Sequence, residues 1–212
     1  MFRARNAGTV SFLPLATAKR AEPYSIRAVC MCTGHVNADS GLKKDSDNAT
    51  INTMDITNEW TKQQNNTGQV IRKQEYTVSG TAYKVDGHHV VLEPSKMEVA
   101  VAELLANKYG KKVELVPQIM YPTGIQTPDY LIDGERFDLK SPTGSGKYLI
   151  KGLIAKKRKQ ADNFVIDVSD CPLDIEEIDC QIKGLYTSPQ VGFVRKIVLI
   201  KNGKVVKVYN RK

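Results

Sequence analysis

The feature that most constrains the fold of this 212-residue chain is the order in which its apolar spacing changes after Pro94. A spacing near 3.6 residues indicates a helix, whereas alternation indicates a strand. The pattern predicts a helix over residues 95–110, strands over 112–117, 128–132 and 135–140, a helix over 148–161 and a strand over 163–168. This α-β-β-β-α-β order predicts an α/β protein in which helices pack on the faces of a mixed sheet.

Further elements are predicted on both sides of this core. Residues 70–78 and 81–85 alternate like strands, and Asp86-Gly87 is a tight-turn signal before a returning strand at 88–92, so we expect an N-terminal β-hairpin. After the core, a helix over 170–186 and two strands around Asn202-Gly203 predict a C-terminal α-β-β extension.

The first third of the chain has a different character. Residues 36–68 are polar and rich in Asn, Asp and Thr, which is typical of a linker or a poorly ordered segment. We therefore expect residues 1–68 to be a poorly ordered or truncated carrier region with a polar linker, and residues 69–212 to form the folded domain.

The net charge of +8 indicates a polyanionic partner. No stretch approaches the roughly 18 apolar residues of a membrane span, so we expect no membrane partner. The densest basic run lies on the predicted helix 148–161 and just before it. It is either a solvated helix face or a contact surface for a phosphate backbone: Lys147, Lys151, Lys156, Lys157, Arg158 and Lys159.

Three charged residues on the hairpin around Asp133-Gly134 are candidates for chemistry: Asp129, Asp138 and Lys140. Asp138 and Lys140 are two residues apart on one strand, so their side chains share a face. Two carboxylates can hold a divalent cation that activates water, and a lysine can neutralise charge that develops on a phosphate oxygen. The alternative is a surface hairpin with an ordinary Asp–Lys pair.

Two flanking residues extend this candidate site. Glu98 lies at the edge of the buried face of its predicted helix, where it can point towards the end of the sheet. It also stands three residues after Ser95, which is the spacing of a capping box, so a purely structural role is open. Gln160 ends the basic helix just before the strand at 163–168.

Glu98, Pro128-Asp129, Asp138-x-Lys140 and Gln160, placed on an α-β-β-β-α-β order, resemble the PD-(D/E)xK nuclease superfamily. More narrowly, TPDYLIDGERFDLKSP followed by KKRKQADNFVID resembles the C-terminal tRNA nuclease domain of bacterial contact-dependent growth inhibition toxins. Similar domains end some phage minor head proteins. The resemblance covers roughly residues 69–212.

This resemblance implies a metal-dependent phosphodiesterase that cleaves tRNA. It implies that Asp129, Asp138 and Glu98 are metal ligands, most readily for Mg²⁺, that Lys140 is the catalytic lysine and that Gln160 is an accessory catalytic residue. It also implies a cognate immunity protein and a bacterial setting, with action in the cytoplasm after delivery as a toxin or as part of a phage-encoded protein. Two alternatives are a DNA endonuclease of the same superfamily and a non-catalytic tail of a phage head or mobile-element protein.

Overall fold

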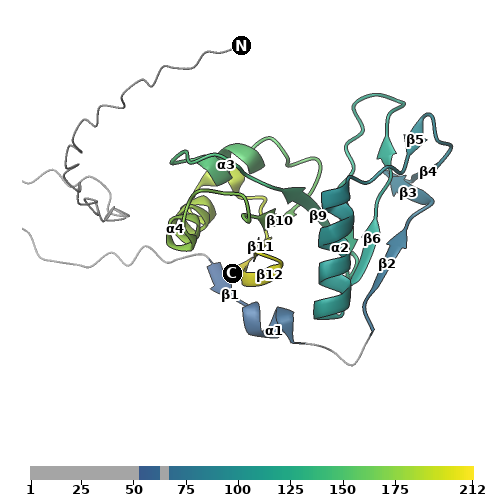
Figure 1. Cartoon of the computed structure of the whole chain (residues 1–212). Helices are drawn as coiled ribbons and strands as arrows, with labels where there is room; N and C mark the ends of the chain where they lie inside the picture. Colours follow the sequence, from purple (N-terminus) through teal and green to yellow (C-terminus); the bar gives the residue numbers. More distant parts are fainter. Residues whose placement is uncertain (1–52, 63–66) are drawn as a thin grey trace, which may run out of the picture. The chain divides into compact units, whose positions relative to one another are not determined.

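The computed structural model of the chain describes residues 53–62 and 67–212, which form a mixed α/β fold (Figure 1). Its main sheet has eight strands in the order β1-β12-β11-β10-β9-β8-β6-β2. These strands are β1 (Thr53–Asp55), β2 (Gln69–Arg72), β6 (Lys112–Leu115), β8 (Tyr130–Ile132), β9 (Glu135–Lys140), β10 (Asn163–Asp167), β11 (Lys196–Lys201) and β12 (Lys204–Arg211). The β9-β10, β10-β11 and β2-β6 pairs are parallel and the other pairs are antiparallel. The predicted mixed sheet is therefore confirmed.

Helices cover both faces of this sheet. They are α1 (Thr57–Thr61), α2 (Lys96–Tyr109), α3 (Leu149–Ile154) and α4 (Ile175–Tyr186), with a 3₁₀ turn η1 (Pro189–Val191). Leu105 of α2 belongs to one buried cluster with Phe137 of β9 and Val165 of β10. Ile150 of α3 and Ile178 of α4 belong to a second cluster with Phe164 of β10. Because neighbouring strand residues point to opposite faces, α2 lies on one side of the sheet and α3 and α4 lie on the other.

The tight turn at Asp133-Gly134 joins β8 to β9 as predicted. Both residues have positive φ, 50° for Asp133 and 85° for Gly134, as a two-residue hairpin turn of this handedness requires. Asn202-Gly203 repeats the same conformation between β11 and β12. The strand pairing predicted from both turn sequences is therefore confirmed.

The N-terminal hairpin uses another turn than the predicted one. It joins β3 (Glu75–Val78) to β4 (Thr81–Lys84) across Ser79-Gly80. The Asp86 carboxylate instead accepts hydrogen bonds from the backbone N–H groups of His88, His89 and Val90, which holds residues 86–90 as a loop. The returning strand is only β5 (Val90–Val91), and it pairs with β7 (Gln118–Ile119). The predicted hairpin turn at Asp86-Gly87 was wrong. The Asp86 carboxylate binds backbone N–H groups that a hairpin would pair with the opposite strand.

Two predicted helices are shorter than expected. The helix expected at 148–161 ends at Ile154, and the turns that follow it are closed by hydrogen bonds from Lys157 N to Ile154 O and from Gln160 N to Lys157 O. On a continuing helix Lys156 and Lys159 would lie one turn apart and repel each other, which disfavours its extension. The helix expected from residue 170 begins at Ile175, because the Asp174 side chain caps it in a capping box with Glu177.

The folded part of the chain also begins earlier than residue 69. β1 pairs with the C-terminal strand β12, and Trp60 of α1 is 7% exposed in the cluster under α2. Residues 53–62 therefore contribute to the sheet and the core, although we expected them to belong to a polar linker. The expectation for residues 1–52 and 63–66 falls outside the described residues. No helix in the described ranges combines the length and apolar character needed to cross a membrane.

Candidate active site

The β8-β9 hairpin places Asp129 opposite Asp138. Tyr130 pairs with Phe137, so the antiparallel register sets the preceding residue, Asp129, across from Asp138. The Leu139 backbone N–H donates a hydrogen bond of 2.6 Å to Asp129 Oδ2 and fixes that carboxylate against β9. The two acids thus meet at the end of the hairpin farthest from its turn.

Asp138 and Lys140 project from the same face of β9, as their spacing predicted. Asp138 is fully buried, and its Oδ2 forms an ion pair with Lys140 Nζ. Lys140 Nζ also donates a hydrogen bond of 2.8 Å to its neighbour's carbonyl, Leu139 O. Among the described residues, Asp138 Oδ1 has no hydrogen-bond donor. A buried carboxylate oxygen without a donor is energetically costly, which makes Asp138 a candidate functional residue.

The environment of this pair favours a bound proton or cation. Burial, and secondly the charge of Asp138, raise the pKa of Asp129 to about 6, although the Leu139 N–H acts in the opposite direction. Burial also raises the pKa of Asp138, while Lys140 opposes that effect. Neighbouring buried carboxylates with raised pKa values are typical of a functional site.

Glu98 reaches this site from the N-terminus of α2. Its charge contributes to raising the pKa of both Asp129 and Asp138, and it lines a small pocket together with Asp129. Its backbone carbonyl accepts a hydrogen bond of 3.0 Å from the buried Tyr130 hydroxyl, which holds the helix end on β8. Its carboxylate accepts a 2.6 Å hydrogen bond from Ser95 N, so the capping box is formed. Glu98 is therefore close to the two aspartates while it also caps its helix.

Gln160 approaches the site through Lys157. Lys157 Nζ donates a hydrogen bond of 3.0 Å to Gln160 Oε1, and its charge lowers the pKa of Asp138. A residue that sequence reasoning missed holds this segment in place: Arg136 Nη2 donates to the carbonyls of Lys159 and Gln160 at 2.8 and 2.5 Å. The alternation of the strand could have identified this residue, because Arg136 shares one face of β9 with Asp138 and Lys140.

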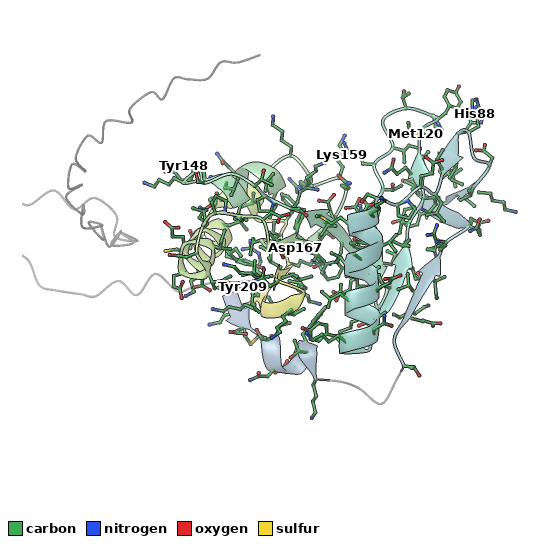
Figure 2. The ribbon with its side chains drawn as sticks, viewed as in Figure 1. His88, Met120, Tyr148, Lys159, Asp167 and Tyr209 are labelled. Atoms are coloured by element: carbon green, nitrogen blue, oxygen red, sulfur yellow. The ribbon has the colours of Figure 1, made fainter. Side chains whose placement is uncertain are left out.

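The remaining residues of the basic run do not share one helix face. Lys147 precedes α3 with its Nζ 5.7 Å from the centre of the exposed Tyr148 ring, and Lys151 lies within α3. Lys156, Arg158 and Lys159 are exposed in the turns that follow it. Figure 2 shows the labelled Tyr148 and Lys159 at separate positions on the fold. The basic residues therefore do not form the predicted single helix. They lie on a basic segment, residues 147–160, whose end Arg136 anchors to β9.

The donor set fits a hard divalent cation at two carboxylates. Asp129 and Asp138 supply oxygen ligands of the type that Mg²⁺ prefers, and one Asp138 oxygen is free of donors. Within residues 53–62 and 67–212, no group of three or more His, Cys, Asp or Glu side chains is arranged to hold a metal ion. The predicted third ligand, Glu98, is held at the start of α2 by its hydrogen bond with Ser95 N.

Part of this chain, including most of the candidate site, is similar to a known protein family. Residues 126–205 match the family model of the contact-dependent growth inhibition CdiA C-terminal domain, and the matched stretch includes Asp129, Asp138 and Lys140. The predicted resemblance to the C-terminal domain of these toxins is confirmed for that stretch.

A solved structure, the CdiA-CT/CdiI toxin and immunity complex from Burkholderia pseudomallei, is similar at 25% sequence identity and a TM-score of 0.44, covering 65% of this chain and 96% of that chain. No curated protein gives a significant match.

Proposed function

We propose, on the similarity of residues 126–205 to the C-terminal domain of contact-dependent growth inhibition toxins, that this chain is a toxin-type, metal-dependent endoribonuclease that cleaves phosphodiester bonds of tRNA. One observation carries the proposal: the buried Asp138 faces Asp129 across the hairpin and is paired with Lys140. The order α2-β6-β8-β9-α3-β10 supports membership of the PD-(D/E)xK superfamily, with β7 as a short addition between β6 and β8.

The two aspartates hold the divalent cation, most readily Mg²⁺. When bound, the cation supplies an activated water and stabilises negative charge on the phosphate. Asp129 is kept against β9 by the Leu139 N–H, and Asp138 is kept in the sheet by the β9 ladder, so neither carboxylate has to reorganise to bind it. This rigidity is what a preorganised electrostatic site requires.

Lys140 places its ammonium group beside the reacting phosphate. Its position is set by Asp138 and by Leu139 O, and it is 16% exposed, so it can reach a substrate atom at the surface of the site. There the ammonium group can orient water or donate to a phosphate oxygen as negative charge develops. Lys157, held by Gln160, adds a second positive charge near Asp138.

The basic segment holds the RNA backbone. Lys147 and Lys151 flank the start of α3, and Lys156, Arg158 and Lys159 are exposed next to the site. Cations of this kind bind phosphates without reading sequence, which suits a folded RNA recognised by shape. Because the similar solved structure is a complex of a toxin with an immunity protein, we also propose a cognate immunity partner, acidic enough to complement this surface. The site of action is then the cytoplasm of a target bacterium.

A cleavage assay tests the proposal directly. The full chain is incubated with total tRNA and with plasmid DNA, in Mg²⁺ or in EDTA, beside Asp138→Ala and Lys140→Ala. Asp170→Ala and Lys204→Ala are matched controls, since both residues are exposed. We expect tRNA fragments in Mg²⁺ from the unaltered chain and both controls only.

Three results would contradict parts of this proposal. Intact tRNA and DNA in every lane would remove the enzymatic function and favour a non-catalytic tail. Cleavage that persists in EDTA and in both site variants would remove the metal mechanism. Cleavage of plasmid DNA with intact tRNA would assign the chain to the DNA endonucleases.

A further inference from the structure

A second charged cavity lies at the other end of the strands that carry the candidate site. Its volume is about 560 Å³, and it is lined by the starts of β9, β10 and β11 and by the end of β12. This volume is within the range of sites that hold small ligands, roughly 300–1,000 Å³. Arg136, which holds the basic segment against β9, is the one residue described with the candidate site that also lines this cavity.

The lining is strongly positive. The cavity is lined by five cationic side chains and two acidic ones, Glu135 and Asp162, so their side chains carry a formal charge of +3. The cations are Arg136, Arg195, Lys196, Arg211 and Lys212. Lys196 Nζ is paired with Glu135 Oε2 at 2.5 Å. Arg195 is exposed, and its side chain has no ion pair among the described residues. A concave surface lined by one sign of charge concentrates the field inside it.

Two of these cations are fixed by neutral partners. The Arg211 guanidinium donates to the carbonyls of Val194, Tyr186 and Val191 at 2.7, 3.1 and 3.3 Å. Arg136 likewise donates to main-chain carbonyls, and its buried Nε has no partner in the described part of the chain. Carbonyls orient a guanidinium group without cancelling its charge, so both arginines remain able to attract an anion.

We propose that this cavity binds a phosphate group carried by a nucleotide, and that in the substrate complex it holds an RNA backbone phosphate outside the cleaved bond. The second clause rests on the proposed function. Arg136 lines the cavity and stands two residues before Asp138 on β9, so the cavity and the aspartates lie along the same strand. Three residues of strand from Glu135 to Asp138 span about 10 Å, so the two positions can hold different phosphates of one backbone.

Binding by the full chain in EDTA tests this inference without any cleavage. The probes are a short single-stranded RNA, AMP and polyglutamate, each titrated against the unaltered chain, Arg195→Ala and the control Lys204→Ala. Lys204 is exposed on the opposite end of β12, so it matches the loss of one charge at a distance from the cavity. We expect Arg195→Ala to weaken RNA binding about threefold to tenfold at low salt and to reduce the salt slope by about one, as loss of one phosphate contact does.

Each outcome decides the inference. Weaker RNA binding with no AMP binding supports a backbone phosphate, whereas Arg195-dependent AMP binding with unchanged RNA affinity supports a free nucleotide as the source. Equal RNA and AMP affinities in Arg195→Ala and Lys204→Ala would overturn the site, and Arg195-dependent binding of polyglutamate alone would reassign it to an acidic protein. Arg195-dependent RNA binding by a chain that cleaves no RNA in Mg²⁺ would defeat the proposed function only.

Discussion

Asp179 and the pair Asp129 and Asp138 differ in the number of donors that surround their carboxylates. Asp179 of α4 accepts hydrogen bonds from Lys207 Nζ at 2.6 Å and from the Tyr209 hydroxyl at 2.7 Å, and it pairs with Lys183 Nζ at 2.6 Å. Asp138 is more deeply buried, yet among the described residues it forms an ion pair with Lys140 alone, and Asp129 lies opposite.

The pKa values of the two groups record this difference. Burial raises the pKa of Asp179, but the hydrogen bonds from Lys183, Lys207 and Tyr209 outweigh it and lower the pKa to about 2. Burial prevails at Asp129 and raises its pKa to about 6. The first carboxylate therefore stabilises the fold in its ionised form, whereas the second costs stability when ionised.

The comparison teaches how to separate structural from functional acids in this chain. Asp179 is half-buried together with its donors, as a structural carboxylate is. Asp138, which we propose to be functional, is buried near another acid and has an oxygen without a donor among the described residues.

The largest effect is expected on cleavage. Asp138→Ala and Lys140→Ala should each lower the single-turnover rate of tRNA cleavage by a factor of about 10²–10³ or more, because each removes a preorganised charge at the reacting phosphate. Asp179→Asn, adjusted for its folded fraction, should cleave at a normal rate. Quenched-flow assays at pH 7.5 measure both. Equal losses in Asp179→Asn and Asp138→Ala would remove the distinction.

The second largest effect is expected for Asp129→Asn, which should raise the free energy of unfolding while it removes a proposed metal ligand. Asp129→Asn keeps an oxygen for the Leu139 N–H and removes a charge whose pKa is raised from 3.8 to about 6, a difference of up to about 3 kcal/mol. Because the folded state holds the proton more tightly, this cost is absent below pH 3.8 and grows as pH rises towards 6. The variant should therefore exceed the unaltered chain in free energy of unfolding at pH 7 and match it at pH 3.5.

Urea titrations at the two pH values measure this gain. In the cleavage assay, the rate of the unaltered chain should rise as pH passes through 6. A variant less stable than the unaltered chain at pH 7 would contradict the assignment of Asp129 as a costly acid.

Asp179→Asn should have the opposite sign. Its lowered pKa contributes stability that is present above pH 3.8 and lost as pH falls through about 2, so the variant should lose about 2 kcal/mol at pH 7. The loss should shrink as pH falls from 4 to 2, and thermal unfolding followed by circular dichroism measures it. A loss that does not change over that interval would show that packing, rather than the ion pairs, is responsible.

The smallest effect separates the two roles of Glu98. Ser95→Ala removes the hydroxyl that accepts the Glu98 N–H and should cost about 1 kcal/mol of stability with little change in cleavage. Glu98→Gln retains the capping box, which accepts Gln at this position, but removes the negative charge beside Asp129. If Glu98 assists catalysis, Glu98→Gln should lower the cleavage rate at unchanged stability. Equal cleavage rates in Glu98→Gln and the unaltered chain would leave Glu98 with its capping role alone.

Local chemistry in the sequence predicted much of this fold. Ser95 and Glu98 began α2 as a capping box, and Asp133-Gly134 closed the β8-β9 hairpin, because both signals act within four residues. That hairpin and its alternation also set Asp129, Asp138 and Lys140 at one place, so the central residues of the candidate site were predictable.

Contacts between distant segments decided the rest. Only the tertiary structure showed that β1 pairs with β12, that Arg136 holds the end of the basic segment against β9, and that four strand ends line a positive cavity. The sequence by itself determined which groups stand near one another along the chain. The tertiary structure decided which charges are neutralised and which are left buried without donors, because that balance depends on partners that come from other elements of the fold.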